Sequence, residues 1–514
     1  MTTNIDHDSI ERDVASYYRY ATLSHTWEGN EPLFEKVVRI VVYDLEESVT
    51  HDKLRIFCKI VRDAGLHWAW SDTCCINKAD HFVLQETLVA MFKWYSGSAV
   101  TIVLLRGVGS PSRRGDLVRS IWNTRAWPLQ EYLASKVVRF YNEDWTLYRN
   151  IDIPNHKESL EIISEMEEAM GISTRALMTL RPNLGDICQK LRLASTREAT
   201  LVEDTAYSLL GIFAISLPVV YGEGDRAIGR LLAQLLASSG DTTILAWKGR
   251  SGSFNSCLPA SITVYNELPH LHVPLPISGA EMESIILKMH ASSLNHTSSM
   301  ALYDRLNGLP PPIFSERRLR LPCLTFKLAP VTEGRRSNNA PGFLFRARAD
   351  SDALGVVEIR TTEHLSQLDS LYLVHPWIDF LLNRQPYRNS VEEIVEKNTD
   401  DSSSFVEVPP VLGQSSHITL ATPKTRAARL VARFERSLSA LLRDEVLAEK
   451  QIQALQLIVR IGQPFGALLL TPIRVNGHEY RRVAASSLIT VQVQEATPGV
   501  INDLLERVRV LDVL

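Results

Sequence analysis

Strand-like and helix-like patterns alternate through the first 150 residues of the chain. Four short runs have the pattern of strands, and they span 20–24, 66–72, 99–105 and 137–141. The run 99–105 is continuously apolar, as expected for a strand buried on both faces of a sheet. Between these runs, apolar residues recur three or four positions apart, which is the spacing of one helix face. The helical segments are 53–64, 81–95 and 128–134. This order predicts an α/β unit with a mostly parallel sheet flanked by helices.

The pattern changes twice further along the chain. Residues 151–247 have the spacing of polar and apolar helices, whereas short strand-like runs dominate beyond residue 247. Asn476 and Gly477, between two such runs, form a dipeptide typical of a tight hairpin turn. We therefore predict three regions: an α/β domain over 1–150, a helical extension over 151–247 and a β-rich α+β region over 248–514.

Two segments of the C-terminal region have a pattern of their own. The polar stretch 388–405, which includes a run of Asp and Ser, predicts an exposed loop. Residues 424–448 place arginines opposite leucines at helical spacing, which predicts an amphipathic helix covering the C-terminal sheet.

The composition is that of a folded, soluble protein. Of its 514 residues, 45% are hydrophobic and 22% charged, which fits two or three globular domains. A net charge of -4 provides no overall basic field for nucleic acid or anionic lipid. The apolar runs are shorter than the ~20 residues of a membrane span, and the polar N-terminus lacks the apolar core of a signal peptide. We expect a cytoplasmic protein without a nucleic-acid partner or a membrane span.

The six cysteines do not have the spacing of a metal site or of a disulfide framework. No C-x-x-C pair occurs, and Cys74 and Cys75 are adjacent. Adjacent side chains on an extended segment point to opposite sides. We predict reduced thiols that are neither metal-bound nor disulfide-linked, and no metal site.

Four sequence blocks together carry a family resemblance. They are YATLSHTW at 20–27, WSDTCCINK at 70–78 with the helix MFKWY at 91–95, RAWPLQE at 125–131, and EDTAYSLLGIF at 203–213 with YGEG at 221–224. In this order they resemble the HET domain of fungal heterokaryon-incompatibility proteins, and the fourth block resembles the extension found in mushrooms and their relatives (basidiomycetes). The resemblance covers about half of the chain. It implies an intracellular effector of non-self recognition and programmed cell death, acting with copies of itself or with other incompatibility proteins.

HET domains in turn resemble TIR domains, some of which hydrolyse NAD. The resemblance implies a TIR-like fold, NAD as the candidate substrate and no further cofactor. Glu131 matches the glutamate on which these NAD hydrolases depend, and Trp127 matches the tryptophan before it. Nicotinamide leaves NAD as a neutral molecule, so the reaction needs no general acid. A carboxylate is suited to stabilise the oxocarbenium-like charge that develops on the ribose.

Further candidate residues follow from the predicted sheet. Ligands of such folds bind at the carboxyl ends of parallel strands. Ser24 and Asp72 end two of the predicted strands, and His25 and Trp27 follow the first of them. We therefore regard Ser24, His25, Trp27, Asp72 and Trp127 as candidate substrate-binding residues around Glu131.

Each candidate also has a structural interpretation. Glu131 would then cap a helix or form a salt bridge, Asp72 would organise a loop, and the tryptophans would be core aromatics. Two functions therefore stay open: an enzyme that hydrolyses NAD with Glu131, and a non-catalytic interaction module that signals by assembly. A polar pocket around Glu131 favours the enzyme, and a filled or apolar cleft favours the module.

One further motif imitates a nucleotide-binding loop. Gly222 and Gly224 stand before an apolar helix, as in a dinucleotide fingerprint, but the spacing of the next glycine is wrong. Glu223 between them would repel a pyrophosphate. We predict a simple turn.

Overall fold

The structure is a computed structural model. It describes residues 14, 17–171, 173, 182–267, 296–329, 332–333, 342–365 and 370–376, and most of 450–514. The predicted loop at 388–405 and the predicted helix at 424–448 lie outside the described residues.

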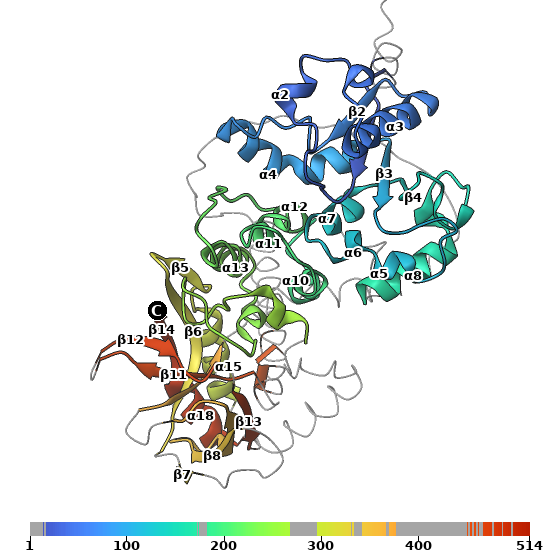
Figure 1. Ribbon diagram of the computed structural model, residues 1–514. Coiled ribbons are helices and arrows are strands. Elements are labelled where there is room, and N and C mark those ends of the chain that lie inside the picture. Colours follow the sequence, from blue (N-terminus) through green and yellow to red (C-terminus); the bar gives the residue numbers. More distant parts are fainter. Residues whose placement is uncertain are drawn as a thin grey trace, which may run out of the picture.

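The first 150 residues build a parallel sheet, as predicted (Figure 1). Its strands are β1 (Tyr20–Ser24), β2 (Trp68–Ser71), β3 (Val100–Leu105) and β4 (Val138–Asn142), in the order β2-β1-β3-β4. All three neighbouring pairs are parallel. Each strand begins and ends within two residues of its prediction. The agreement is clearest for β3, whose continuous apolar run is buried almost throughout.

Helices cover both faces of this sheet. Helix α3 (Val49–Asp63) packs Phe57 against Leu23 and Ile102 on one face. The opposite face is covered by α4 (His81–Gly97), α6 (Ile121–Thr124) and α7 (Trp127–Ala134). Two of these helices begin at side-chain caps: Ser48 accepts a hydrogen bond from a backbone N–H in the first turn of α3, and Asp80 accepts two in the first turn of α4. The helical signals at 53–64, 81–95 and 128–134 are confirmed.

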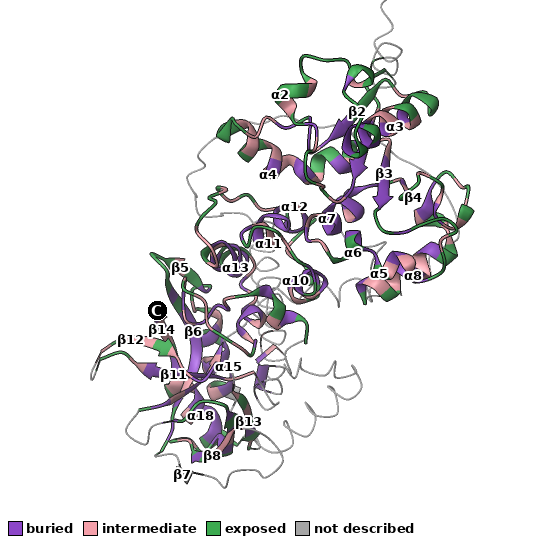
Figure 2. Cartoon of the chain, viewed as in Figure 1, coloured by how far each residue is buried: buried purple, intermediate pink, exposed green. Residues whose placement is uncertain are grey.

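The alternation of side chains along β1 decides where its polar residues point. Ala21 and Leu23 lie in the cluster with α3. Thr22 and Ser24 therefore point to the opposite face, which α7 covers. All four side chains are buried (Figure 2). Strand β1 thus ends with a hydroxyl group inside the protein, on the side of α7.

Helices continue through the second region. They are α8 (Leu160–Met170), α10 (Ile187–Ser195), α11 (Asp204–Tyr207), α12 (Leu210–Phe213) and α13 (Arg226–Ser239). Helix α12 lies against α4 at Gly211, where a Cβ atom would stand 2.3 Å from Cβ of Phe92. Only glycine permits this close approach. The second region is therefore packed directly onto the first.

The C-terminal region is β-rich, as predicted; its described residues include two sheets and the helices α15 and α18. One sheet has the order β10-β11-β12-β14-β6-β5, with β5 (Ile313–Ser315), β6 (Arg318–Lys327), β10 (Tyr372–Pro376), β11 (Leu468–Pro472), β12 (Glu479–Arg482) and β14 (Val508–Val513). The other has the order β13-β9-β8-β7, with β7 (Thr332–Glu333), β8 (Phe343–Arg348), β9 (Leu354–Thr361) and β13 (Leu488–Val493). The helices are α15 (His296–Asn307) and α18 (Pro498–Arg507).

The predicted hairpin is confirmed: β11 and β12 are antiparallel, and the N–H of Gly477 donates to Arg474 O at 2.9 Å.

The helical region and the β-rich region share a hydrophobic core. One buried cluster extends from β3 and β4 through α13 to β6 and β14. Arg482 donates to the carbonyl oxygens of Leu245 and Trp247, and its guanidinium lies over the Trp247 ring. The hydroxyl of Tyr265 donates to Ile244 O at 2.7 Å, so residues just beyond 247 pack with the helices before it. The boundary at 247 stays a prediction, and these contacts cross it.

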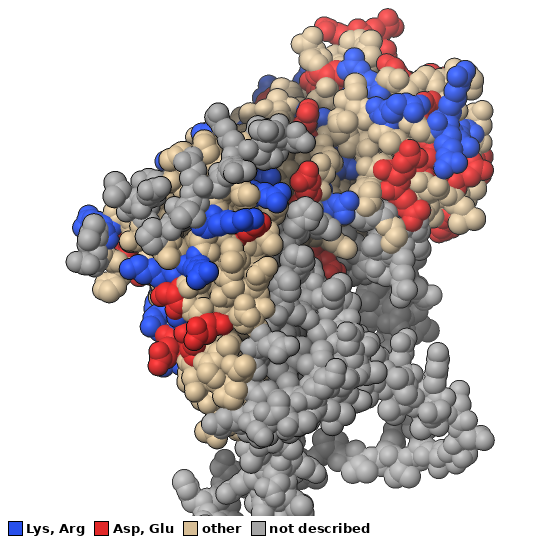
Figure 3. Space-filling view, turned by 90° about the horizontal axis from the view of Figure 1, so that it is seen from below, with Lys and Arg blue, Asp and Glu red and all other residues tan. Residues whose placement is uncertain are grey.

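The surface carries both signs of charge. On the face shown in Figure 3, acidic and basic side chains are interspersed, in keeping with a net charge of -4. Within the described part of the chain, none of the helices combines the length and the apolar character that crossing a membrane requires.

Candidate functional site

The structure brings Ser24 and Glu131 into direct contact. Ser24 is the last residue of β1, and Glu131 lies in α7, which covers that face of the sheet. The Ser24 hydroxyl donates to Oε2 of Glu131 at 2.5 Å. Both side chains are buried, and only 4% of Glu131 is exposed. The candidate carboxyl group therefore lies inside the protein, at the carboxyl end of a central strand.

Two aromatic residues, Trp122 and Tyr95, lie beside Ser24 and Glu131. Neither was among the candidate site residues. The indole N–H of Trp122 donates to Oγ of Ser24 at 2.7 Å. The hydroxyl of Tyr95 donates to Leu23 O at 3.0 Å and lies near enough to the Glu131 carboxyl group to influence its pKa. Tyr95 belongs to the second sequence block, and Trp122 lies between blocks. The signal available for both was that a buried Trp or Tyr needs a hydrogen-bond partner.

Burial changes the protonation of Glu131. It raises the pKa of this carboxyl group from 4.5 to about 8, and the negative charge of Asp72 acts in the same direction. The hydrogen bond from Ser24 and the nearby Tyr95 hydroxyl lower the pKa and offset part of the rise. Most Glu131 side chains are therefore neutral at pH 7. A cation placed beside Glu131 would favour the carboxylate.

A row of buried hydroxyl groups fixes α7 on the sheet beneath Glu131. Oγ1 of Thr22 lies 2.7 Å from Oγ1 of Thr101, which lies 2.5 Å from Oγ of Ser135. Ser135 in turn donates to the backbone carbonyl of Glu131 at 2.7 Å. The backbone of Glu131 is thereby tied to β1 and β3.

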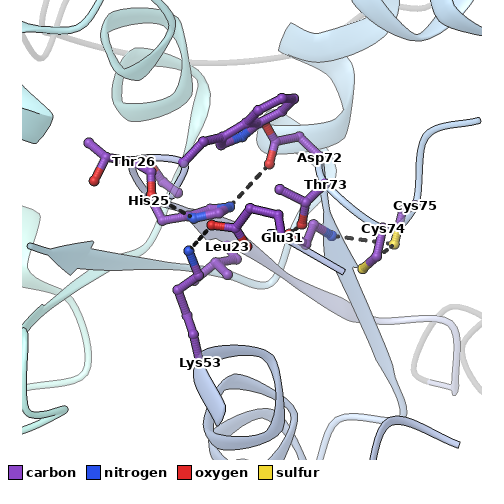
Figure 4. Close-up of polar contacts among 12 residues, drawn as sticks. Leu23, His25, Thr26, Glu31, Lys53, Asp72, Thr73, Cys74 and Cys75 are labelled. Atoms are coloured by element: carbon purple, nitrogen blue, oxygen red, sulfur yellow. Dashed lines mark hydrogen bonds and ion pairs between the residues drawn. The ribbon is translucent and has the colours of Figure 1, made fainter. Parts of the chain in front are cut away.

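Asp72 joins the ends of β1 and β2. Its Oδ1 lies 3.2 Å from Nε2 of His25, and its Oδ2 accepts a hydrogen bond from the indole N–H of Trp27 at 2.8 Å (Figure 4). The His25 ring is buried, and the Asp72 side chain is 17% exposed. This carboxylate organises the segment after β1, as the structural interpretation of Asp72 expects, and it stays within electrostatic reach of Glu131.

Two buried polar atoms on the segments that follow β1 and β2 lack a hydrogen-bond partner among the described residues. Nζ of Lys78 lies 3.3 Å from the centroid of the Trp27 ring, which is half exposed. Burial lowers the pKa of Lys78, and the charge of Asp72 offsets part of this effect. The two atoms are Nζ of Lys78 and Oγ1 of Thr26. Such atoms retain the capacity to bind a polar ligand.

Trp127 lies elsewhere. Its side chain packs in the hydrophobic clusters between α4, α7 and the helical region, and its hydrogen bond goes to Asp204 of α11. Among the candidate residues, the structure thus brings together Ser24 and Glu131, and separately His25, Trp27 and Asp72. Trp127 attaches the helical region to the sheet, and Trp122 occupies the place beside Ser24.

The glycine motif is a turn, as predicted. Gly222 and Gly224 have positive φ angles of 92° and 63°. Their N–H groups donate to Oε1 of Glu203 at 2.8 and 2.9 Å. A carboxylate of the protein itself therefore holds the position that a phosphate takes in a nucleotide-binding loop.

The cysteines are free thiols, but the side chains of Cys74 and Cys75 are not oriented as predicted. The side chains of Cys74 and Cys75 do not point to opposite sides: their sulfur atoms lie 4.0 Å apart. The expectation was wrong because the segment after β2 is a turn and not an extended strand, with the N–H of Cys75 donating to Ser71 O at 2.9 Å. No group of three or more His, Cys, Asp or Glu side chains in the described ranges is arranged to hold a metal ion.

Comparisons with known proteins agree with the sequence blocks. Residues 20–114 match the family model of the heterokaryon incompatibility protein (HET), a range that includes Ser24 and Asp72 and ends before Glu131. The vegetative incompatibility protein HET-E-1 of Podospora anserina is 31% identical over 226 residues, covering 41% of this chain and 16% of that protein. The chain thus spans less than a fifth of this relative, and no solved structure matches it. The N-terminal α/β unit is therefore similar to the HET domain of heterokaryon incompatibility proteins.

Proposed function

We propose that this chain acts in heterokaryon incompatibility, as an effector of non-self recognition, and that its chemistry is the hydrolysis of NAD at Glu131. The similarity to HET-E-1 supports the first part. One observation carries the second: a buried glutamate, hydrogen-bonded by Ser24, lies at the carboxyl end of a central parallel strand. Basidiomycete origin and the TIR-like character of the domain belong to the same proposal.

The charges of the site suit a cationic glycoside. Asp72 and ionised Glu131 place negative charge where positive charge develops on the ribose as the neutral nicotinamide leaves. Trp122 hydrogen-bonds to Ser24, which hydrogen-bonds to Glu131, so the orientation of the carboxyl group is set before a substrate enters. A bound nicotinamide cation favours the ionised form of Glu131, which the empty protein disfavours.

The burial of Glu131 restricts access to it. With 4% of the residue exposed, a substrate reaches the carboxyl group only after neighbouring side chains move. We expect such movement to accompany assembly of several chains. The dilute monomer is then weakly active, and activity rises with protein concentration.

A second candidate function is the non-catalytic interaction module. Two observations favour it: the surroundings of Glu131 are filled by Ser24, Trp122 and Tyr95, and aromatic side chains are exposed at a sheet edge. Strand β2 is an edge strand, and it exposes 46% of Trp68. The ring of Tyr18, itself 58% exposed, stacks on Trp68 with a centroid distance of 5.8 Å. Exposed aromatic side chains beside a free sheet edge are suited to join chains together.

The loss of NAD from solutions of the full chain tests the proposal. Glu131→Gln keeps the shape of the side chain and removes its charge, so we expect at least ~100-fold slower turnover. The matched control is Glu86→Gln, on the exposed side of α4, which should keep full activity. Each protein is assayed dilute and after concentration into assemblies.

Each outcome separates the two functions. A wild-type assembly that leaves NAD intact overturns the enzyme. Cell death that persists in fungal cells expressing Glu131→Gln supports the interaction module. A Glu131→Gln protein that fails to fold shows a structural role for Glu131.

A further inference from the structure

Two thiols meet at the turn that follows β2, and a third lies nearby. Sγ of Cys74 and Sγ of Cys75 are 4.0 Å apart (Figure 4). Cys58 of α3 is close enough for its charge to influence Cys74, and Cys75 in turn influences Cys58. All three are free. This cluster has no part in the proposed chemistry at Glu131.

The two adjacent thiols differ in exposure and in hydrogen bonding. Cys74 is buried, with 8% exposed, and Cys75 is exposed. The backbone N–H of Ser71 donates to Sγ of Cys75 at 3.4 Å. Cys75 is therefore the thiol that a solute reaches, and a backbone dipole points at its sulfur.

The hydrogen bond between the thiols polarises them. The contact with the Cys74 thiol lowers the pKa of Cys75; burial opposes this, and the hydrogen bond from the Ser71 N–H supports it. The same contact between the thiols, followed by burial, raises the pKa of Cys74. The exposed Cys75 thiol is therefore the more readily ionised of the two. An attacking thiol and a resolving thiol differ in this way.

We propose that Cys74 and Cys75 are a modification site for two-electron oxidants of the hydroperoxide class, with Cys75 as the attacking and Cys74 as the resolving thiol. The Cys75 thiolate attacks one peroxide oxygen and breaks the O–O bond. It becomes a sulfenic acid, and the leaving hydroxide or alkoxide takes a proton from solvent. The Cys74 sulfur then attacks the Cys75 sulfur and forms the S–S bond. The sulfenic hydroxyl leaves with the Cys74 proton as water.

Closing this bond changes the turn. The sulfur atoms must approach from 4.0 Å to about 2.0 Å, which requires rotation of the peptide between them. Asp72 lies two residues before Cys74 and holds His25 and Trp27. Oxidation should therefore disturb the Asp72 contacts and leave the sheet intact.

Mass spectrometry of the oxidised full chain tests the proposal. After brief treatment with hydrogen peroxide and alkylation of free thiols, trypsin releases residues 63–78, which hold Cys74 and Cys75 but not Cys58. We expect this peptide to be unalkylated and lighter by two hydrogen atoms. Cys74→Ser should accumulate a sulfenic acid at Cys75, which dimedone traps. Cys75→Ser should react at least ~10-fold more slowly at this peptide.

Cys58, the third thiol, provides the matched control. Cys58→Ser should form the same product at the same rate as the wild type, and equal melting temperatures show that the serine variants are folded. Free, alkylatable Cys75 after peroxide treatment overturns the proposal. So does a dimedone adduct at Cys74 in Cys75→Ser formed as fast as the adduct at Cys75 in Cys74→Ser, or a disulfide found only between chains.

Discussion

Two buried glutamates lie on the same side of the molecule's first sheet, and their surroundings differ. Glu165 of α8 is fully buried and accepts hydrogen bonds from the Tyr148 hydroxyl at 2.6 Å and the Gly115 N–H at 2.9 Å. Arg149 pairs with it at 3.2 Å. Glu131 has the hydroxyl groups of Ser24 and Tyr95 beside it, and no Lys or Arg of the described residues forms an ion pair with it.

The two carboxyl groups therefore differ in whether neighbouring groups compensate for their burial. A cation and a backbone N–H compensate the burial of Glu165, as a buried charge requires. Glu131 lacks this compensation, so its burial is tolerated mainly in the neutral form. A buried acid without a cation beside the carboxyl end of a strand is typical of a functional site. Substitutions of Glu131 and Glu165 can test this difference.

The largest expected effect is in how stability depends on pH. The pKa of Glu131 is about 8 in the folded protein and near 4.5 in the unfolded chain. Its contribution to stability is complete below pH 4.5 and is lost as the pH rises to 8, because only the unfolded chain releases the proton in this window. Each pKa unit corresponds to about 1.4 kcal/mol.

Glu131→Gln removes this titration. The unfolding free energy of the variant, relative to wild type, should therefore rise between pH 5 and pH 8.5 in urea titrations. Glu86→Gln should show no such trend. A constant difference across this range would mean that Glu131 is already ionised in the folded protein at pH 5.

The second effect concerns Glu165. Glu165→Gln leaves Arg149 without its buried partner, so the protein should lose about 3 kcal/mol of unfolding free energy at pH 7. The urea midpoint measures this loss, with Glu131→Gln as the comparison variant. Equal losses in the two variants would remove the distinction between the two sites.

The smallest expected change in unfolding free energy comes from removing the hydrogen bond between Ser24 and Glu131. Ser24→Ala should cost about 1 kcal/mol, the net value of one hydrogen bond. Because this bond lowers the pKa of Glu131, its loss raises that pKa further. The value of kcat/KM for NAD, whose pH dependence reports the free enzyme, should rise through about pH 8 in the wild type and at higher pH in Ser24→Ala. Coincident pH–rate profiles would show that Glu131 does not control the rate.

Local patterns predicted the elements of the first region well. Strands β1 to β4 and the helices between them follow from apolar runs and helical spacing, since each side chain's environment is set by its own element. The order of the six-stranded sheet does not follow in this way. Strand β14 lies between β12 and β6 and pairs residues almost 190 positions apart, such as Val510 and Pro322, and no local pattern records that pairing.

The site was predictable in part for the same reason. The resemblance identified Glu131 and the predicted end of a strand identified Ser24, and the structure places the two in contact. The resemblance gave no means to distinguish Trp122 from Trp127, because their positions depend on how the helical region packs against α7. The 4.0 Å distance between the Cys74 and Cys75 sulfurs depends on a turn that the continuous apolar run did not show.

The packing of Arg482 over Trp247 has a mechanical consequence. A domain on a flexible tether can swing or detach without disturbing its neighbour, but two regions with a common hydrophobic core cannot. The C-terminal sheet, α13 and α7, which carries Glu131, contribute side chains to one buried cluster. The β-rich region therefore cannot move far without disturbing the packing of the helices beside Glu131.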